Sequence, residues 1–94
     1  MKIVWTKFSE TSLLEIINYI ENDFGNLTAE KYYSKVLETV DNIGISPELF
    51  PVFQSSTETR KAVINKKTIL YYKIIEENIM LLAFYDVRMG THKL

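Results

Sequence analysis

Two consecutive stretches with helical spacing of apolar residues constrain the fold of this chain most. In residues 9–25 and again in residues 27–44, an apolar side chain recurs every three or four positions, which places these side chains on one face of an α-helix. The two faces comprise Leu13, Ile16, Ile17, Ile20 and Phe24, and then Ala29, Tyr32, Tyr33, Val36, Leu37, Val40 and Ile43. Because only about three residues separate the stretches, we expect an antiparallel helical hairpin that turns both faces toward one surface.

Capping residues mark the ends of both expected helices. Ser9 is the expected N-cap of the first helix, and Ser12 with Glu15 offers an alternative capping box. The glycine that ends the first stretch stops that helix. Thr28 is the expected N-cap of the second helix, and Gly44 is expected just beyond its end.

Four short segments have the composition of β-strands. Residues 2–6 form the first, and residues 60–65, 68–75 and 79–88 follow the helices. The short connections between the last three predict an antiparallel meander, and the last segment, apolar on both faces, is expected in the interior of the sheet. The order β-α-α-β-β-β predicts an α+β fold in which the helical hairpin packs on one face of a small curled, mainly antiparallel sheet. We expect a single domain over residues 1–94.

The longest irregular stretch, residues 45–59, contains both prolines. Leu49, Phe50, Val52 and Phe53 give it more apolar residues than a linker between domains carries. We therefore expect these side chains to anchor the stretch to the fold.

Composition narrows the function classes. The chain has no cysteine, which excludes disulfides, thiolate metal sites and cysteine nucleophiles, and no apolar run reaches the roughly 18 residues that a membrane span needs. Residues 1–54 carry four Lys against eight acids, and residues 55–94 carry seven Lys and Arg against four acids. The net charge of −1 lacks the strong basic excess typical of proteins that bind nucleic acid directly.

Together, these patterns resemble the RelE/ParE superfamily, the toxins of bacterial type II toxin–antitoxin systems. The segment LLEIINYIENDFG is similar to the first helix of that family, and ISPELFP with the arginine that follows resembles its link into the sheet. The segment ILYYKIIEENIMLLAFYDVR is similar to its paired terminal strands, which often end in an aromatic residue, Asp, any residue and Arg. The resemblance covers nearly the whole chain.

The resemblance implies a cytoplasmic toxin that uses no metal or cofactor and that a cognate antitoxin protein silences by wrapping around it. RelE-like members cut mRNA in the ribosomal A site, whereas ParE-like members inhibit DNA gyrase and have no known catalytic residues. Contact with DNA is expected only through the antitoxin, and no contact with a membrane is expected.

The residues that a RelE-like ribonuclease uses are only partly matched. Arg60 meets the first cationic position, but Ala62 stands near the second and Ile69 stands where an arginine is expected. Arg88 matches the arginine at the end of the last strand, and His92 lies near the position of the terminal acid or base. Because the loss of one such contact costs about 10²–10³ in rate, the sequence favours a ParE-like, non-catalytic toxin.

Two alternatives stay open beside the ParE-like toxin. They are a RelE-like endoribonuclease, with Arg60, Arg88 and His92 as its candidate catalytic residues, and a non-toxic binding module of a regulatory complex. For contact with a target or partner, the sequence predicts Arg60, Tyr72, Tyr85, Asp86 and Arg88.

Each predicted site residue also has a structural interpretation. Asp86 and Arg88 lie two residues apart on one strand face and are candidates for pairing with neighbours at the sheet edge. Arg60 is a candidate for a salt bridge to an acid on a helix. Tyr71 and Tyr72 point to opposite faces, so one belongs to the core and the other to the open face.

Overall fold

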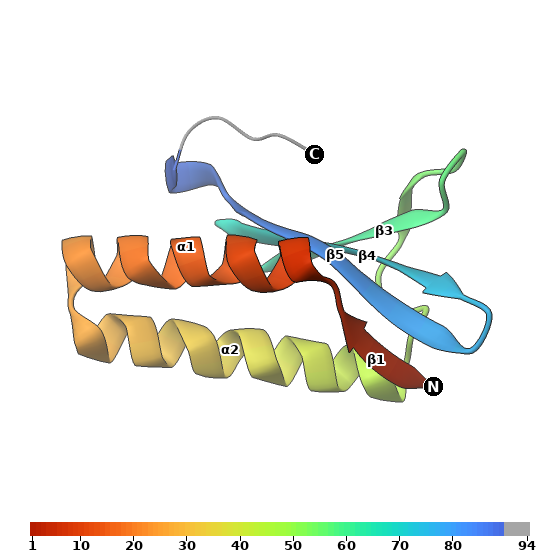
Figure 1. Ribbon diagram of the computed structural model, residues 1–94, viewed down its shortest axis with the longest axis horizontal. Helices are drawn as coiled ribbons and strands as arrows, with labels where there is room; N and C mark the ends of the chain where they lie inside the picture. The colour runs from red at the N-terminus through yellow and green to blue at the C-terminus, as the bar shows by residue number, and fades with distance from the viewer. Residues whose placement is uncertain (90–94) are drawn as a thin grey trace.

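The computed structural model describes residues 1–89 and shows a helical hairpin beside a five-stranded sheet (Figure 1). The elements in chain order are β1 (Lys2–Trp5), α1 (Lys7–Phe24), α2 (Asn26–Ile45), β2 (Val52–Gln54), β3 (Thr59–Ile64), β4 (Thr68–Ile75), β5 (Asn78–Asp86) and the 3₁₀ turn η1 (Val87–Met89). The predicted element order is confirmed, with the short strand β2 as an addition. His92, one of the candidate catalytic residues, lies outside the described residues.

The strand order in the sheet is β1-β5-β4-β3-β2. Strands β2 to β5 pair with one another antiparallel, as predicted for the last three strands, and β1 joins the edge of β5 in parallel. The last strand is therefore an interior strand, as predicted. A register shift places Tyr71 opposite Ala83 but Tyr72 opposite Leu81, so β5 carries one extra residue, and a bulge of this kind increases the twist of a sheet.

Both helices of the described chain lie on one side of the sheet (Figure 1). The core between the two layers is apolar, and its fully buried members include Ile16, Ile20, Val36, Ile43, Leu70, Tyr72, Ile79 and Leu81. Residues that alternate with these on β3, β4 and β5 point to the other face of the sheet, and they include Lys61, Val63, Ile69, Lys73 and Tyr85. The amphipathic hairpin on one sheet face is confirmed.

The helix boundaries differ from the sequence prediction. The N-cap of α1 is Thr6, whose hydroxyl accepts a hydrogen bond from the backbone N–H of Ser9 at 3.1 Å, while Ser9 itself is buried inside the helix. Gly25 alone separates the helices, with φ of +90°, and α2 then continues through Gly44 to Ile45. Tertiary contacts outweigh the local signal at Gly44, which packs against the side chain of Ile3.

Two hydroxyls near the start of α1 fasten the helix to β5. The Thr6 hydroxyl donates to the Leu81 carbonyl at 2.7 Å, and the Ser12 hydroxyl accepts from the backbone N–H of Phe84 at 2.9 Å. Ser12, expected as part of a capping box, therefore serves the neighbouring strand. These bonds hold α1 along the strand that ends in Asp86.

Candidate functional site

The C-terminal end of β5 forms a corner in which Asp86, Arg88 and Thr68 bind one another; we call it the Asp86–Arg88 corner. Asp86 is only 1% exposed, and its carboxylate accepts hydrogen bonds from Arg88 Nε at 2.9 Å and from Arg88 Nη2 at 2.7 Å. The hydroxyl of Thr68, its neighbour on β4, donates at 2.8 Å, and the backbone N–H of Arg88 donates at 2.9 Å. The carboxylate thus has four donors, which is what an ionised group buried at a sheet end requires.

The charges of the corner stabilise each other. Burial alone would raise the pKa of Asp86, but the hydrogen bonds from Arg88 and Thr68 and the charge of Arg88 hold that pKa below its ordinary value. The same hydrogen bonds raise the pKa of Arg88. Both groups are therefore ionised at neutral pH, and the guanidinium is held in one orientation by two parallel bonds.

Arg88 also connects the corner to the far end of α1. Its guanidinium carbon lies 5.5 Å from the ring centre of Phe24 and 6.0 Å from that of Tyr19. These two rings pack edge to face, with centres 6.2 Å apart. Cation–π contact with two rings further restricts the guanidinium, so the side chain of Arg88, in the turn η1 just after β5, is held in place.

Arg60 and Tyr72 lie at a different place and both hold the loop that enters the sheet. They are opposite each other on β3 and β4. Arg60 Nη1 donates to the Phe50 carbonyl at 2.7 Å, and the Tyr72 hydroxyl donates to the Pro47 carbonyl at 2.8 Å. The acid nearest to Arg60 is Glu48 at 4.0 Å, in this loop and not on a helix as the sequence suggested.

The placement of Tyr72 corrects an expectation. Tyr72 was predicted to contact a partner, but its ring is fully buried on the helix side of the sheet. Tyr71 lies on the opposite face, where it is 6% exposed and its ring centre is 5.1 Å from that of Phe53 in β2. Among the residues predicted to contact a target or partner, Tyr85 lies half-buried on the helix-free face, opposite Ile69.

The predicted site residues therefore form two separate groups. One group contains Arg60 and Tyr72, and the other contains Asp86 and Arg88. On β4, Tyr72 of the first group and Thr68 beside the second are four positions apart, a separation of about 13 Å along a strand. The structure brings Asp86 and Arg88 together but does not bring Arg60 to them. Within residues 1–89, no cluster of His, Asp and Glu has the arrangement of a metal site.

Sequence reasoning missed three residues that shape the corner, namely Thr68, Phe24 and Tyr19. Thr68 contacts Asp86 only because the register of β4 and β5 places them opposite each other, and this register is not visible in local sequence. Phe24 was assigned to the core, yet it is 51% exposed and contacts Arg88. Its position at the very end of the helix was the one available signal for exposure.

Comparisons with known proteins support the fold. No family model matches the sequence, and no curated protein matches it either. Among solved structures, the chain matches one described as the chromosomal ParDE TA system from P. aeruginosa, with a TM-score of 0.73 and 16% sequence identity. The match covers 92% of this chain and 95% of the other, so the described chain has a RelE/ParE-like fold. Neither helix of residues 1–89 has the length and apolar composition needed to cross a bilayer.

Proposed function

We propose that this chain is the toxin of a toxin–antitoxin system and that it acts as a ParE-like toxin, by binding its target. The observation that carries the proposal is the similarity in fold to a chain of a ParDE system over 92% of the sequence. The proposal includes a cognate antitoxin protein as partner and DNA gyrase as target, in a cytoplasmic setting.

The arrangement of the arginines supports binding over RNA cleavage. Metal-free RNA cleavage needs a base, an acid and cations that converge on one phosphate. The guanidinium of Arg60 is engaged by the Phe50 carbonyl, and that of Arg88 is engaged by Asp86, at separate places on the sheet. Ala62, near the position where a RelE-like nuclease would carry its second lysine, is fully buried. Arg60, Arg88 and Asp86 fit better as residues that shape binding surfaces.

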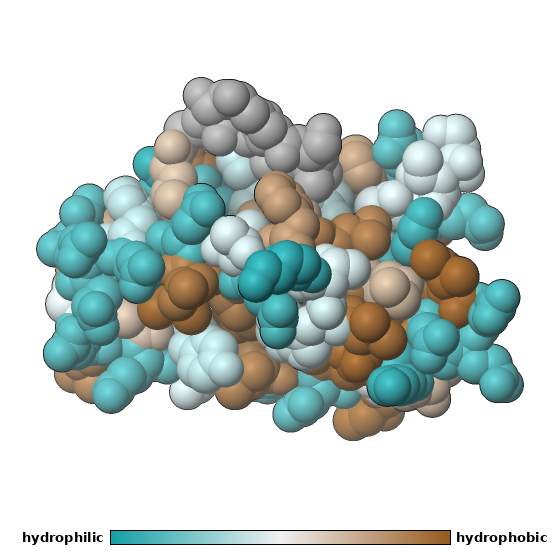
Figure 2. Space-filling view, viewed as in Figure 1, coloured by the Kyte–Doolittle hydropathy of each residue, from teal (hydrophilic) through white to brown (hydrophobic). Residues whose placement is uncertain are grey.

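An apolar hollow of about 500 Å³ on the helical hairpin is suited to the antitoxin. Trp5, Leu14, Ile17 and Tyr33 line it, and Leu14 is 58% exposed. Figure 2 shows apolar areas interrupted by hydrophilic ones on the face it presents. A polypeptide with apolar side chains at helical spacing would cover such a surface, in the way that helices bind apolar grooves.

Growth and complex formation test the proposal. Expression of the chain alone should arrest growth, and co-expression with the product of the adjacent gene should restore it. Leu14→Asp, on α1, should weaken the complex with that product. Ile45→Asp serves as the matched control, because Ile45 is an apolar residue at the end of α2 that is 81% exposed and does not line the hollow. Normal growth on expression alone would contradict the toxin assignment.

Two assays separate the targets. The purified chain should inhibit supercoiling by DNA gyrase, and primer extension on translated mRNA should show no cuts in the ribosomal A site. Cuts that disappear in Arg88→Ala would instead establish the RelE-like activity. Growth arrest with neither effect would point to a target other than gyrase.

A further inference from the structure

An open hollow of about 370 Å³ lies between α2 and η1, on the helix side of the sheet, and it shares Arg88 with the Asp86–Arg88 corner. We call it the α2–η1 hollow. Its polar lining consists of three cations and three uncharged side chains: Lys31, Lys35, Arg88, Thr28, Tyr32 and Asn65. Among residues 1–89 no carboxylate lines it, although Glu30 and Glu38 share a neighbouring pocket on α2 with Lys31 and Lys35. This composition suits an anion.

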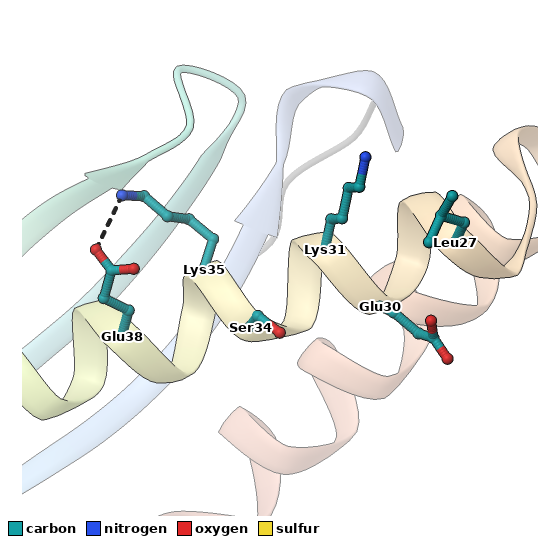
Figure 3. Close-up of a pocket in the computed structure, with 6 residues that line it drawn as sticks. All are labelled: Leu27, Glu30, Lys31, Ser34, Lys35 and Glu38. Carbon is teal, nitrogen blue, oxygen red and sulfur yellow. Dashed lines mark hydrogen bonds and ion pairs between the residues drawn. The ribbon is translucent and has the colours of Figure 1, made fainter.

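One face of α2 supplies most of this lining. Thr28, Lys31, Tyr32 and Lys35 are three, four and seven positions apart, so their side chains share one side of the helix. Figure 3, a close-up of a neighbouring pocket on α2, shows the side chains of Lys31 and Lys35 projecting from one side of the helix and Glu30 pointing the other way. The first turn of α2 contains no acidic residue, and no side chain caps it, so the positive end of the helix dipole borders the hollow uncompensated.

The three cationic side chains that line the hollow can still bind a ligand. No acid among residues 1–89 lies within ion-pair distance of Lys31. Lys35 contacts Glu38 at 3.3 Å, but both side chains are at least half exposed, and pairs of this kind are weak. Arg88 uses Nε and Nη2 for Asp86, which leaves Nη1 without a hydrogen bond within the described chain.

The hydroxyl of Tyr32 is a second, independent sign of a missing ligand. Tyr32 is only 4% exposed, and its buried hydroxyl lies near the hydroxyl of Thr68 but makes no hydrogen bond of good geometry within residues 1–89. Buried polar atoms almost always have a partner, and an orphan in a native fold points to an absent water or ion. Burial raises the pKa of Tyr32 to about 12, so the hydroxyl keeps its proton at neutral pH.

We propose that the α2–η1 hollow binds a phosphate group, held by Lys31, Lys35 and Arg88 and by the hydroxyls of Thr28 and Tyr32. A phosphate dianion has several acceptor oxygens and therefore uses a set of separate donors of this kind. A single carboxylate would need fewer hydrogen-bond donors. The phosphate is free in solution, part of a nucleotide, or part of a nucleic-acid backbone, and the chemistry of recognition is shared by all three.

Titration of the full chain with inorganic phosphate, followed by amide chemical shifts at constant ionic strength, tests the site. Saturable shifts are expected at Thr28, Lys31 and Tyr32 with a dissociation constant in the range of roughly 1 mM. Lys31→Ala should weaken binding roughly fivefold to tenfold, and Tyr32→Phe about threefold or more. Lys7→Ala, at an exposed lysine in the first turn of α1, should leave binding unchanged.

Two further ligands identify the source of the phosphate. Binding of a nucleoside monophosphate but not of a dinucleotide phosphodiester would indicate a small phosphomonoester, and comparable binding of both would indicate a nucleic-acid backbone. Either result supports the site. Absence of saturable shifts with all three ligands, or equal affinity in wild type, Lys31→Ala and Tyr32→Phe, would overturn it. The readout is direct binding, so it is independent of growth arrest and gyrase inhibition.

Discussion

Replacement of Asp86 by Asn should destabilise the protein strongly, because the carboxylate is the common acceptor of the Asp86–Arg88 corner. The substitution keeps the shape but removes the charge that two guanidinium bonds at 2.7 and 2.9 Å require. Breaking a buried ion pair costs about 3–5 kcal/mol. Since the side chain of Arg88 is 21% exposed, water compensates part of this loss, and we expect a cost of about 2–3 kcal/mol.

Urea unfolding at pH 7 measures this cost. A chain of this length has a free energy of unfolding of about 5–14 kcal/mol, so the variant should still fold, with a melting temperature lowered by roughly 10–20 °C. A double-mutant cycle with Arg88→Met isolates the interaction between the two side chains, which should contribute about 1.5–3 kcal/mol. A coupling energy below about 0.5 kcal/mol would refute the argument.

The pH dependence of the same variant gives a second check. The pKa of Asp86 is lowered in the folded protein, so its contribution to stability is fully present above the unfolded-state value of about 3.9. That contribution is lost as pH falls through the folded-state pKa. The difference in stability between wild type and Asp86→Asn should therefore be large at pH 7 and shrink below about pH 4. A difference that stays constant down to pH 3 would show that the charge is not its cause.

Three further substitutions test the interpretation of single residues. Tyr72→Phe removes the hydrogen bond to Pro47 and should cost about 0.5–1.5 kcal/mol in urea unfolding, with faster proteolysis in the 46–51 loop as a second readout. Gly25→Ala should cost about 1–3 kcal/mol by thermal unfolding because φ of +90° strains an L-residue, although no atom lies within 4 Å of the added Cβ. Tyr32→Phe in phosphate-free buffer should leave the melting temperature unchanged or raise it, since it deletes a buried hydroxyl that makes no hydrogen bond of good geometry within residues 1–89, and a clear decrease would show that its contact with Thr68 stabilises the fold.

The layers of the fold were predictable because they follow from periodicity. The apolar spacing of α1 and α2 and the short connections between β3, β4 and β5 each specify a local structure that tertiary contacts reinforce. The strand β2 was missed because its three residues, all exposed, give no periodic signal. The parallel pairing of β1 with β5 joins residues more than seventy positions apart, so nothing in the local sequence of either strand indicates it.

At the candidate site, only contacts between residues close in sequence could be predicted. The pairing of Asp86 with Arg88 follows from a spacing of two residues, and the structure contains it. The roles of Thr68 and Tyr72 depend on register and on which face of β4 points to the helices, and a single bulge in β5 changes which β5 residue lies opposite Thr68. Alternation therefore showed that Tyr71 and Tyr72 face opposite ways, but not that both would be buried.

The position of the two arginines bears on how the proposed toxin acts. Arg60 holds a loop at one end of the sheet, and Arg88 holds the junction of β5 with α1 at the other, so each has a structural partner of its own. A catalyst would need these charges free and directed at one phosphate. A protein that acts by binding needs instead a rigid surface, and fixed arginines provide this because little side-chain entropy remains to be lost on association. A phosphate bound near Arg88 would depend on Lys31 and Tyr32 as well, because Nε and Nη2 of Arg88 already bind Asp86.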